Sequence, residues 1–141
     1  MSQAMARLKK VADELGLPLG ERKNTYNSRL AQELGKWAES QGMGDKFHDA
    51  VFRAYFVDGK NIGKTTVLAA IVKEIGFSEK EVDEVLKKRT FKDAVDSDWE
   101  LAYRLGISCV PTFVVDDGSV EGAQPYEVLE QLLLKKGIKR K

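Results

Sequence analysis

Cys109 is the residue of this sequence whose chemistry is easiest to name, because a thiol can act as a nucleophile and the sequence holds no other cysteine. It stands two residues before Pro111. An exposed thiolate can attack a disulfide and form a mixed disulfide, but a second thiol must then resolve that bond. Cys109 is therefore a candidate for one-thiol exchange with a partner or substrate. The alternative is a small apolar side chain buried in the core.

Two other features contain residue types that are common at phosphate-binding or metal sites, but their number or spacing does not match such sites. The segment 59–66, Gly-Lys-Asn-Ile-Gly-Lys-Thr-Thr, has three residues between its glycines where a phosphate-binding loop needs four. We interpret it as a joint between two helices, with Thr65 or Thr66 capping the second. His48 is the only histidine, and its place in a helical pattern indicates a surface or boundary position. We expect no metal site.

The stretch after Cys109 is the clearest β signal in the sequence. Residues 112–115, Thr-Phe-Val-Val, are β-branched and aromatic, and Pro111 stands at their start, where a missing N–H harms a sheet least. Asp117 and Gly118 tolerate positive φ in a tight turn. The sequence thus predicts one hairpin, with Cys109 in the loop that leads into it.

The rest of the sequence has helical periodicity, interrupted by glycines and by capping residues. Ser78 and Glu81 have the spacing of a capping box, in which each side chain accepts a hydrogen bond from the other residue's backbone N–H. The expected helices are 3–15, 24–40 with Asn24-Thr25 as cap, a helix from Asp45 through Phe56, 67–75, 78–86, 90–105 and 125–136. The fold class is therefore α+β and mostly helical, with one C-terminal hairpin and a final helix.

Composition excludes several function classes. Twenty-three basic residues against 22 acidic ones leave a formal charge of +1, so nothing points to nucleic acid or to a membrane surface. The apolar runs are too short to span a bilayer, and the N-terminus lacks the apolar core of a signal peptide. With one cysteine among 141 residues, we expect a cytoplasmic protein in a reducing compartment.

Three segments in a fixed order resemble one known family. They are residues 52–56, Phe-Arg-Ala-Tyr-Phe; residues 106–115, Gly-Ile-Ser-Cys-Val-Pro-Thr-Phe-Val-Val; and residues 122–125, Gly-Ala-Gln-Pro. This order resembles DsbA-like thioredoxin-fold proteins, in particular the FrnE-type, 2-hydroxychromene-2-carboxylate isomerase-like branch. The resemblance implies a partial thioredoxin-like fold. Residues 1–105 would be a mainly helical insert region and residues 106–141 the C-terminal part of that fold, packed as a single unit.

The same resemblance assigns roles at the hairpin loop. It implies a cis peptide bond at Val110-Pro111, with Val110, Pro111 and Thr112 placed to receive an extended peptide or a protein thiol. Cys109 would be the catalytic residue, as a single thiol. The family's Cys-x-x-Cys segment has no match in this sequence. We therefore expect a truncated homologue of a thiol–disulfide oxidoreductase that is weak or inactive alone, and whether the chain is an enzyme stays open.

Two other functions fit the resemblance or the hairpin. One is a glutathione-dependent isomerase or transferase, which would make glutathione its cofactor; otherwise we expect none. The other is a non-catalytic interaction module that binds through the hairpin edge at Phe113, Val114 and Val115. A lone two-stranded hairpin leaves one row of N–H and C=O groups unpaired along each edge. We therefore expect a homodimer, or a partner chain, to complete the sheet.

Overall fold

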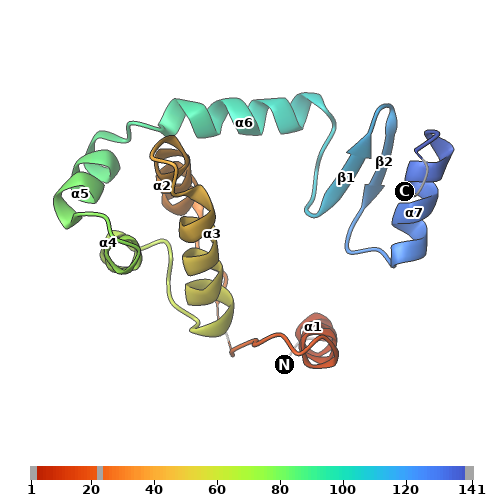
Figure 1. Cartoon of the computed structure of the whole chain (residues 1–141), viewed down its shortest axis with the longest axis horizontal. Coiled ribbons are helices and arrows are strands. Elements are labelled where there is room, and N and C mark those ends of the chain that lie inside the picture. The colour runs from red at the N-terminus through yellow and green to blue at the C-terminus, as the bar shows by residue number, and fades with distance from the viewer. Residues whose placement is uncertain (1–2, 22–23, 139–141) are drawn as a thin grey trace. The chain divides into compact units, whose positions relative to one another are not determined.

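The computed structural model describes residues 3–21 and 24–138, which form two compact units, one up to Asp96 and one from Ser97. The boundary lies inside a helix, α6. Helices dominate, and the hairpin forms a two-stranded sheet (Figure 1). The elements are α1 Gln3–Glu14, α2 Arg29–Ser40, α3 Gly44–Phe52, η1 Arg53–Val57, α4 Thr65–Glu74, α5 Glu79–Lys88, α6 Lys92–Arg104, β1 Thr112–Val115, β2 Gly118–Glu121 and α7 Tyr126–Lys135. The predicted α+β, mostly helical class is confirmed.

Helices α2 to α5 share the core of the first unit. Their apolar residues recur at helical spacing, and this spacing places them on one face of each helix. Leu34 and Leu68 are fully buried, and the ring of Trp37 lies 4.3 Å from that of Phe77, centroid to centroid. Helix α4 lies in this core and buries Leu68, Ile71 and Val72.

Capping residues in the sequence predicted the start of α5 correctly, but not the starts of α2 and α6. The Ser78–Glu81 capping box is present and begins α5. Helix α2, however, begins at Arg29 and not near Asn24-Thr25, because the Asn27 side chain accepts the backbone N–H of Arg29 at 2.8 Å and forms a turn there. Helix α6 begins at Lys92 and not after Thr90, since Arg89 has a left-handed φ of 52° and a turn follows it.

The helix predicted from Asp45 through Phe56 changes geometry midway. It is α-helical to Phe52 and becomes the π-helix η1 from Arg53 to Val57. Phe52 and Phe56, four residues apart and so on one side of the predicted helix, are 57% and 40% exposed. The segment after α1 is fixed to η1, because Gly20 donates its N–H to the Phe56 carbonyl at 2.9 Å.

In the second unit, the antiparallel strands β1 and β2 are followed by α7, which packs on the sheet (Figure 1). The predicted hairpin is confirmed, but its turn lies one residue earlier than expected. Asp116 and Asp117 form the turn, and Asp116 has the positive φ, 52°. Gly118 is the first residue of β2 and faces α7. A Cβ there would lie 3.1 Å from Leu132 Cδ1 and 3.0 Å from Lys136 Cε.

Replacing Gly118 by alanine is therefore expected to lower the stability of the second unit by about 1 kcal/mol, because the Leu132 and Lys136 side chains have to move to admit the new methyl group. Thermal unfolding followed by circular dichroism measures the effect. The neighbouring exposed residue gives a matched control, since Ser119→Ala adds nothing to the α7 face. Equal melting temperatures for the two variants would contradict this account of Gly118.

Candidate functional site

The loop before β1 presents Cys109 and Val110 to solvent. The Cys109 thiol is exposed, and Val110 is 90% exposed. The peptide bond between Val110 and Pro111 is cis. Cys109 is therefore not a core residue, which leaves its thiol accessible to a disulfide in solution.

Hydrogen bonds fix the backbone of this loop. Thr112 Oγ1 donates to the Cys109 carbonyl at 2.6 Å and lies 3.9 Å from Cys109 Sγ. Gly122 donates its N–H to the Pro111 carbonyl at 2.7 Å, and the Gln124 side chain donates to the Glu121 carbonyl at 2.7 Å. The Gly-Ala-Gln-Pro segment thus supports the loop from the β2 side. The loop is held in place while Cys109 and Val110 stay exposed.

The outer edge of β1 has no strand beside it among residues 3–21 and 24–138. Strands pair Phe113 with Val120 and Val115 with Gly118, and the Gly122-to-Pro111 bond continues the same series. In an antiparallel pair, hydrogen-bonded positions alternate with positions whose N–H and C=O point away. Thr112 and Val114 therefore direct their backbone groups outward. We call these four groups the β1 edge.

The three residues predicted at the interface lie on or beside this edge. Phe113 is 39% exposed and Val114 is 44% exposed, while Val115 is half-buried. Phe113 and Val115 share a face with Gly118, which contacts α7, so Val114 lies on the opposite face. Large apolar side chains are thus accessible on both faces at the β1 edge.

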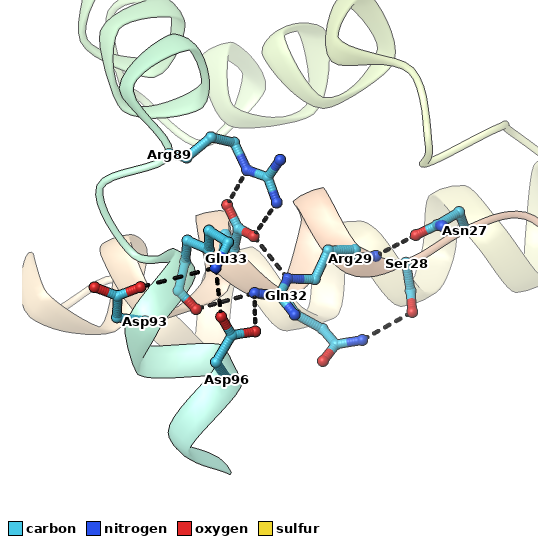
Figure 2. A network of polar contacts seen from close by, with 9 residues as sticks. Asn27, Ser28, Arg29, Gln32, Glu33, Arg89, Asp93 and Asp96 are labelled. Atoms are coloured by element: carbon cyan, nitrogen blue, oxygen red, sulfur yellow. Dashed lines mark hydrogen bonds and ion pairs between the residues drawn. The ribbon is translucent and has the colours of Figure 1, made fainter. Parts of the chain in front are cut away.

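A second polar cluster, not predicted from the sequence, lies in the first unit (Figure 2). Glu33 is 1% exposed and receives hydrogen bonds from two guanidinium groups. Arg29 Nε lies 2.7 Å from Glu33 Oε1, and Arg89 donates from Nε and Nη2 to the two carboxylate oxygens at 2.7 and 2.6 Å. Asp96 accepts from Arg29 at 2.6 Å and from Lys92 at 2.7 Å.

The ion pairs of this cluster lower the pKa values of its two carboxylates. The hydrogen bonds from Arg89 and then Arg29 lower the pKa of Glu33 below its ordinary value, although burial acts in the opposite direction. The pKa of Asp96 is also lowered, by Lys92 and then by Arg29. Both carboxylates are ionised at neutral pH and have no proton to donate. The cluster therefore joins α2 to α5 and α6, and neither carboxylate can act as a general acid at neutral pH.

The remaining sequence candidates lie apart from the loop in the chain. His48 Nε2 lies 3.1 Å from Glu39 Oε1 on the surface of the first unit. Thr65 is the first residue of α4, and Lys64 precedes it as N-cap. Within the described ranges, no group of three or more His, Cys, Asp or Glu side chains is placed to hold a metal ion. In those same ranges, no helix has both the length and the apolar character needed to cross a bilayer.

A family model, the DSBA-like thioredoxin domain, matches residues 1–134. The chain belongs to this family. The DSBA-like assignment confirms the predicted resemblance. A curated relative, "Uncharacterized protein YwbO" of Bacillus subtilis (strain 168), is 30% identical over 105 residues, which are 74% of this chain and 52% of that protein.

Solved structures agree with the DSBA-like assignment. A probable DsbA oxidoreductase from Streptomyces coelicolor aligns with a TM-score of 0.79 at 28% identity, covering 100% of this chain and 64% of that one. A 2-hydroxychromene-2-carboxylate isomerase aligns with a TM-score of 0.76 at 20% identity, covering 95% of this chain and 64% of that one. At that identity the likeness to the isomerase shows the fold alone. This DSBA-like chain spans about half the length of the curated relative and about two thirds of the solved ones.

Proposed function

We propose that this chain is a homologue of the DsbA-type thiol–disulfide oxidoreductases in which the Pro111 loop binds an extended peptide and Cys109 exchanges with a disulfide of that peptide. One observation carries the proposal: an exposed thiol stands directly before a strand whose outer edge has no other strand beside it in the part of the chain that the structure describes. Such an edge binds extended peptides by main-chain hydrogen bonds, and family membership makes disulfide chemistry the first expectation.

The exchange step balances with one cysteine and one added thiol. The Cys109 thiolate attacks one sulfur of the peptide disulfide, the S–S bond breaks, and the released peptide thiolate takes up a proton from water. The product is a mixed disulfide at Cys109. A second thiol, from the peptide or from a small thiol such as glutathione, must attack this bond to free Cys109. Since the sequence has one cysteine, we expect turnover to be weak or absent without an added thiol.

No specific observation favours the glutathione-dependent isomerase over this proposal, because the likeness to the solved isomerase is at the level of the fold. Binding to immobilised glutathione in the absence of disulfides would be the discriminating result in favour of the isomerase. We also place the protein in the cytoplasm, where a lone exposed thiol stays reduced.

The proposal predicts that Cys109 reacts fastest with a disulfide carried by an extended peptide. The wild type is incubated with a short disulfide-bonded peptide and with the same peptide N-methylated on its backbone, and the mixed disulfide is followed by mass spectrometry. N-methylation should slow the reaction about tenfold, because it removes N–H groups that bind to the loop or edge.

Cys109→Ser is the matched variant and should form no adduct with either peptide. An exposed thiol without a peptide site would react with both peptides at the same rate, and that result would contradict the proposal. Disulfide reduction that persists in Cys109→Ser would contradict it as well, since the sequence offers no other thiol.

A further inference from the structure

The start of helix α6 has little apolar contact with the rest of the first unit. Val95 is 2% exposed, and within α6, all of which the structure describes, it is the one buried residue. By comparison, α4 buries three residues and α2 buries six. Elements with few buried apolar contacts open at a lower free energy than the core of the same fold. Whether the start of α6 stays in place therefore depends strongly on its polar contacts.

These polar contacts come from three charged side chains on two helices (Figure 2). Arg29 of α2 places Nη2 at 2.6 Å from Asp96 Oδ1 of α6, and the same nitrogen donates to the Lys92 carbonyl at 3.0 Å. Lys92 Nζ lies 2.7 Å from Asp96 Oδ2. The Asp96 carboxylate thus lies between two cations, one from each helix. We call Arg29, Lys92 and Asp96 the α6 latch.

The two cations of the α6 latch lie at the end of a helix that favours anions. Lys92 is the first residue of α6, and the Arg29 guanidinium contacts its carbonyl oxygen. A helix N-terminus carries a partial positive charge, which is unfavourable for cations in the first turn. Asp96 offsets this cost because its carboxylate contacts both cations. Without the charge of Asp96, two like charges and the helix dipole would oppose the attachment of α6 to α2.

We propose that the α6 latch is an electrostatic switch, which lets the start of α6 detach from α2 when Asp96 is neutralised or screened by salt, while the α2–α5 core stays folded. The joint before α6 limits the movement. Arg89 has a left-handed φ of 52°, which is unfavourable for arginine, and its hydrogen bonds to Glu33 at 2.7 and 2.6 Å hold it there. The opening is thus confined to residues after Arg89, and it does not depend on thiol chemistry at Cys109.

Native-state hydrogen exchange followed by NMR tests whether the opening is local. The Val95 N–H donates to the Phe91 carbonyl at 3.2 Å and reports on the first turn of α6, whereas the N–H of the fully buried Val72 reports on the core. We expect Val95 to be protected at least about tenfold less than Val72. Low urea should change the protection of Val95 little, because a local opening exposes little surface. Equal protection with equal urea dependence would overturn the proposal.

A charge-neutral variant and salt test the electrostatic basis of the switch. Asp96→Asn should lower the protection factor of Val95 about tenfold at low salt, because charge-assisted hydrogen bonds to two cations are lost. Asp93→Asn is the matched control, since the Asp93 side chain is on the same helix, is 99% exposed and lies 3.9 Å from Lys92 Nζ. It should lower the protection about threefold or less.

Raising the salt concentration from about 20 mM to about 1 M should lower the protection of Val95 about fivefold in the wild type and leave it unchanged or higher in Asp96→Asn. Equal effects of the two asparagine variants would overturn the proposal. A wild-type protection that does not respond to salt would overturn it as well.

A second substitution separates charge from local geometry. In the Asp96→Asn background, Lys92→Met removes one of the two cations and keeps a residue that favours helix. We expect the protection of Val95 to recover at least about threefold relative to Asp96→Asn alone, because the remaining Arg29 no longer faces a like charge at the start of α6. Unchanged or lower protection in the double variant would overturn the electrostatic switch.

Discussion

Replacing Glu33 by glutamine is expected to destabilise the first unit by about 2–3 kcal/mol, the range for lost hydrogen bonds between charged groups. Glu33 is 1% exposed, and both of its carboxylate oxygens accept hydrogen bonds from guanidinium groups. Glutamine has nearly the same shape but no charge, so Arg89 loses the anion that balances it and Arg29 keeps only Asp96. Whole domains have about 5–15 kcal/mol of stability, so the loss would be a large share of the total.

Urea unfolding measures this loss, with Trp37 as the reporter. The sequence has two tryptophans, so a Trp99→Phe background leaves Trp37, in the core of the first unit, as the only one. Glu39→Gln is the matched control, because Glu39 lies on the same helix and pairs with His48 on the surface. That control should change stability by about 0.5 kcal/mol or less. Equal midpoints for the two glutamine variants would contradict a structural role for the Glu33 cluster.

The same cluster predicts how stability changes with acid. The pKa of Glu33 is lower in the folded chain than its ordinary value, because Arg89 and then Arg29 hydrogen-bond to the carboxylate. A lowered pKa stabilises the fold fully above the ordinary glutamate value, and this stabilisation is lost as the pH falls through the lowered one. We therefore expect the wild type to lose stability below the ordinary glutamate range, with a shallower loss in Glu33→Gln. Parallel pH profiles of the unfolding free energy would contradict this assignment.

The sequence could predict the features that depend on neighbours in the chain. The Ser78 capping box and the hairpin depend on residues a few positions apart, and both are present. The hairpin turn was placed one residue late, because Gly118 was interpreted as a turn glycine. The structure requires a small residue at position 118 because side chains of α7 and its C-terminal end pack against it. That contact joins residues far apart in the sequence, so no local pattern could indicate it.

The Glu33 cluster shows the same limit for a polar site. Arg29 and Glu33 are four residues apart on α2, a spacing typical of an ordinary surface pair. Glu33 is buried together with a second partner, Arg89, which lies 56 residues away in the sequence. The sequence signal available was that Glu33 adjoins Leu34 in an otherwise apolar stripe. This signal alone does not distinguish a buried glutamate from one at the edge of the stripe.

Apolar periodicity predicted which face of a helix is apolar but not whether that face is covered. Leu101 and Leu105 have helical spacing in the helix predicted over residues 90–105, yet they are 49% and 58% exposed. Phe52 in α3 is 57% exposed. At the candidate site the outcome was different, because the loop and strand around Cys109 were placed correctly from local sequence. The exposure of the thiol itself depends on tertiary packing and came from the structure.

Replacing Gly20 by alanine is expected to be the most damaging change outside the buried core. A Cβ at this position would lie 1.9 Å from the carbonyl oxygen of Val57 and 2.8 Å from its carbon. These are backbone atoms of η1, so no side-chain rotation can relieve the contact. The Gly20-to-Phe56 hydrogen bond must break as the segment moves away. We expect a loss of about 3 kcal/mol, the upper end of the usual cost of overpacking.

Gly16 provides the contrast, because it lies just after α1 with a φ of +65° and nothing within 4 Å of its added Cβ. Gly16→Ala costs conformational strain alone, about 1 kcal/mol. Hydrogen exchange separates the two mechanisms. The backbone N–H at position 20 donates to the Phe56 carbonyl. In Gly20→Ala this N–H should exchange faster, whereas in Gly16→Ala it should stay protected from exchange. If the amide at position 20 stays protected in Gly20→Ala, the segment still lies against η1 and η1 has moved to admit the methyl group. That result would contradict the role of Gly20 as the residue that lets this segment lie against η1.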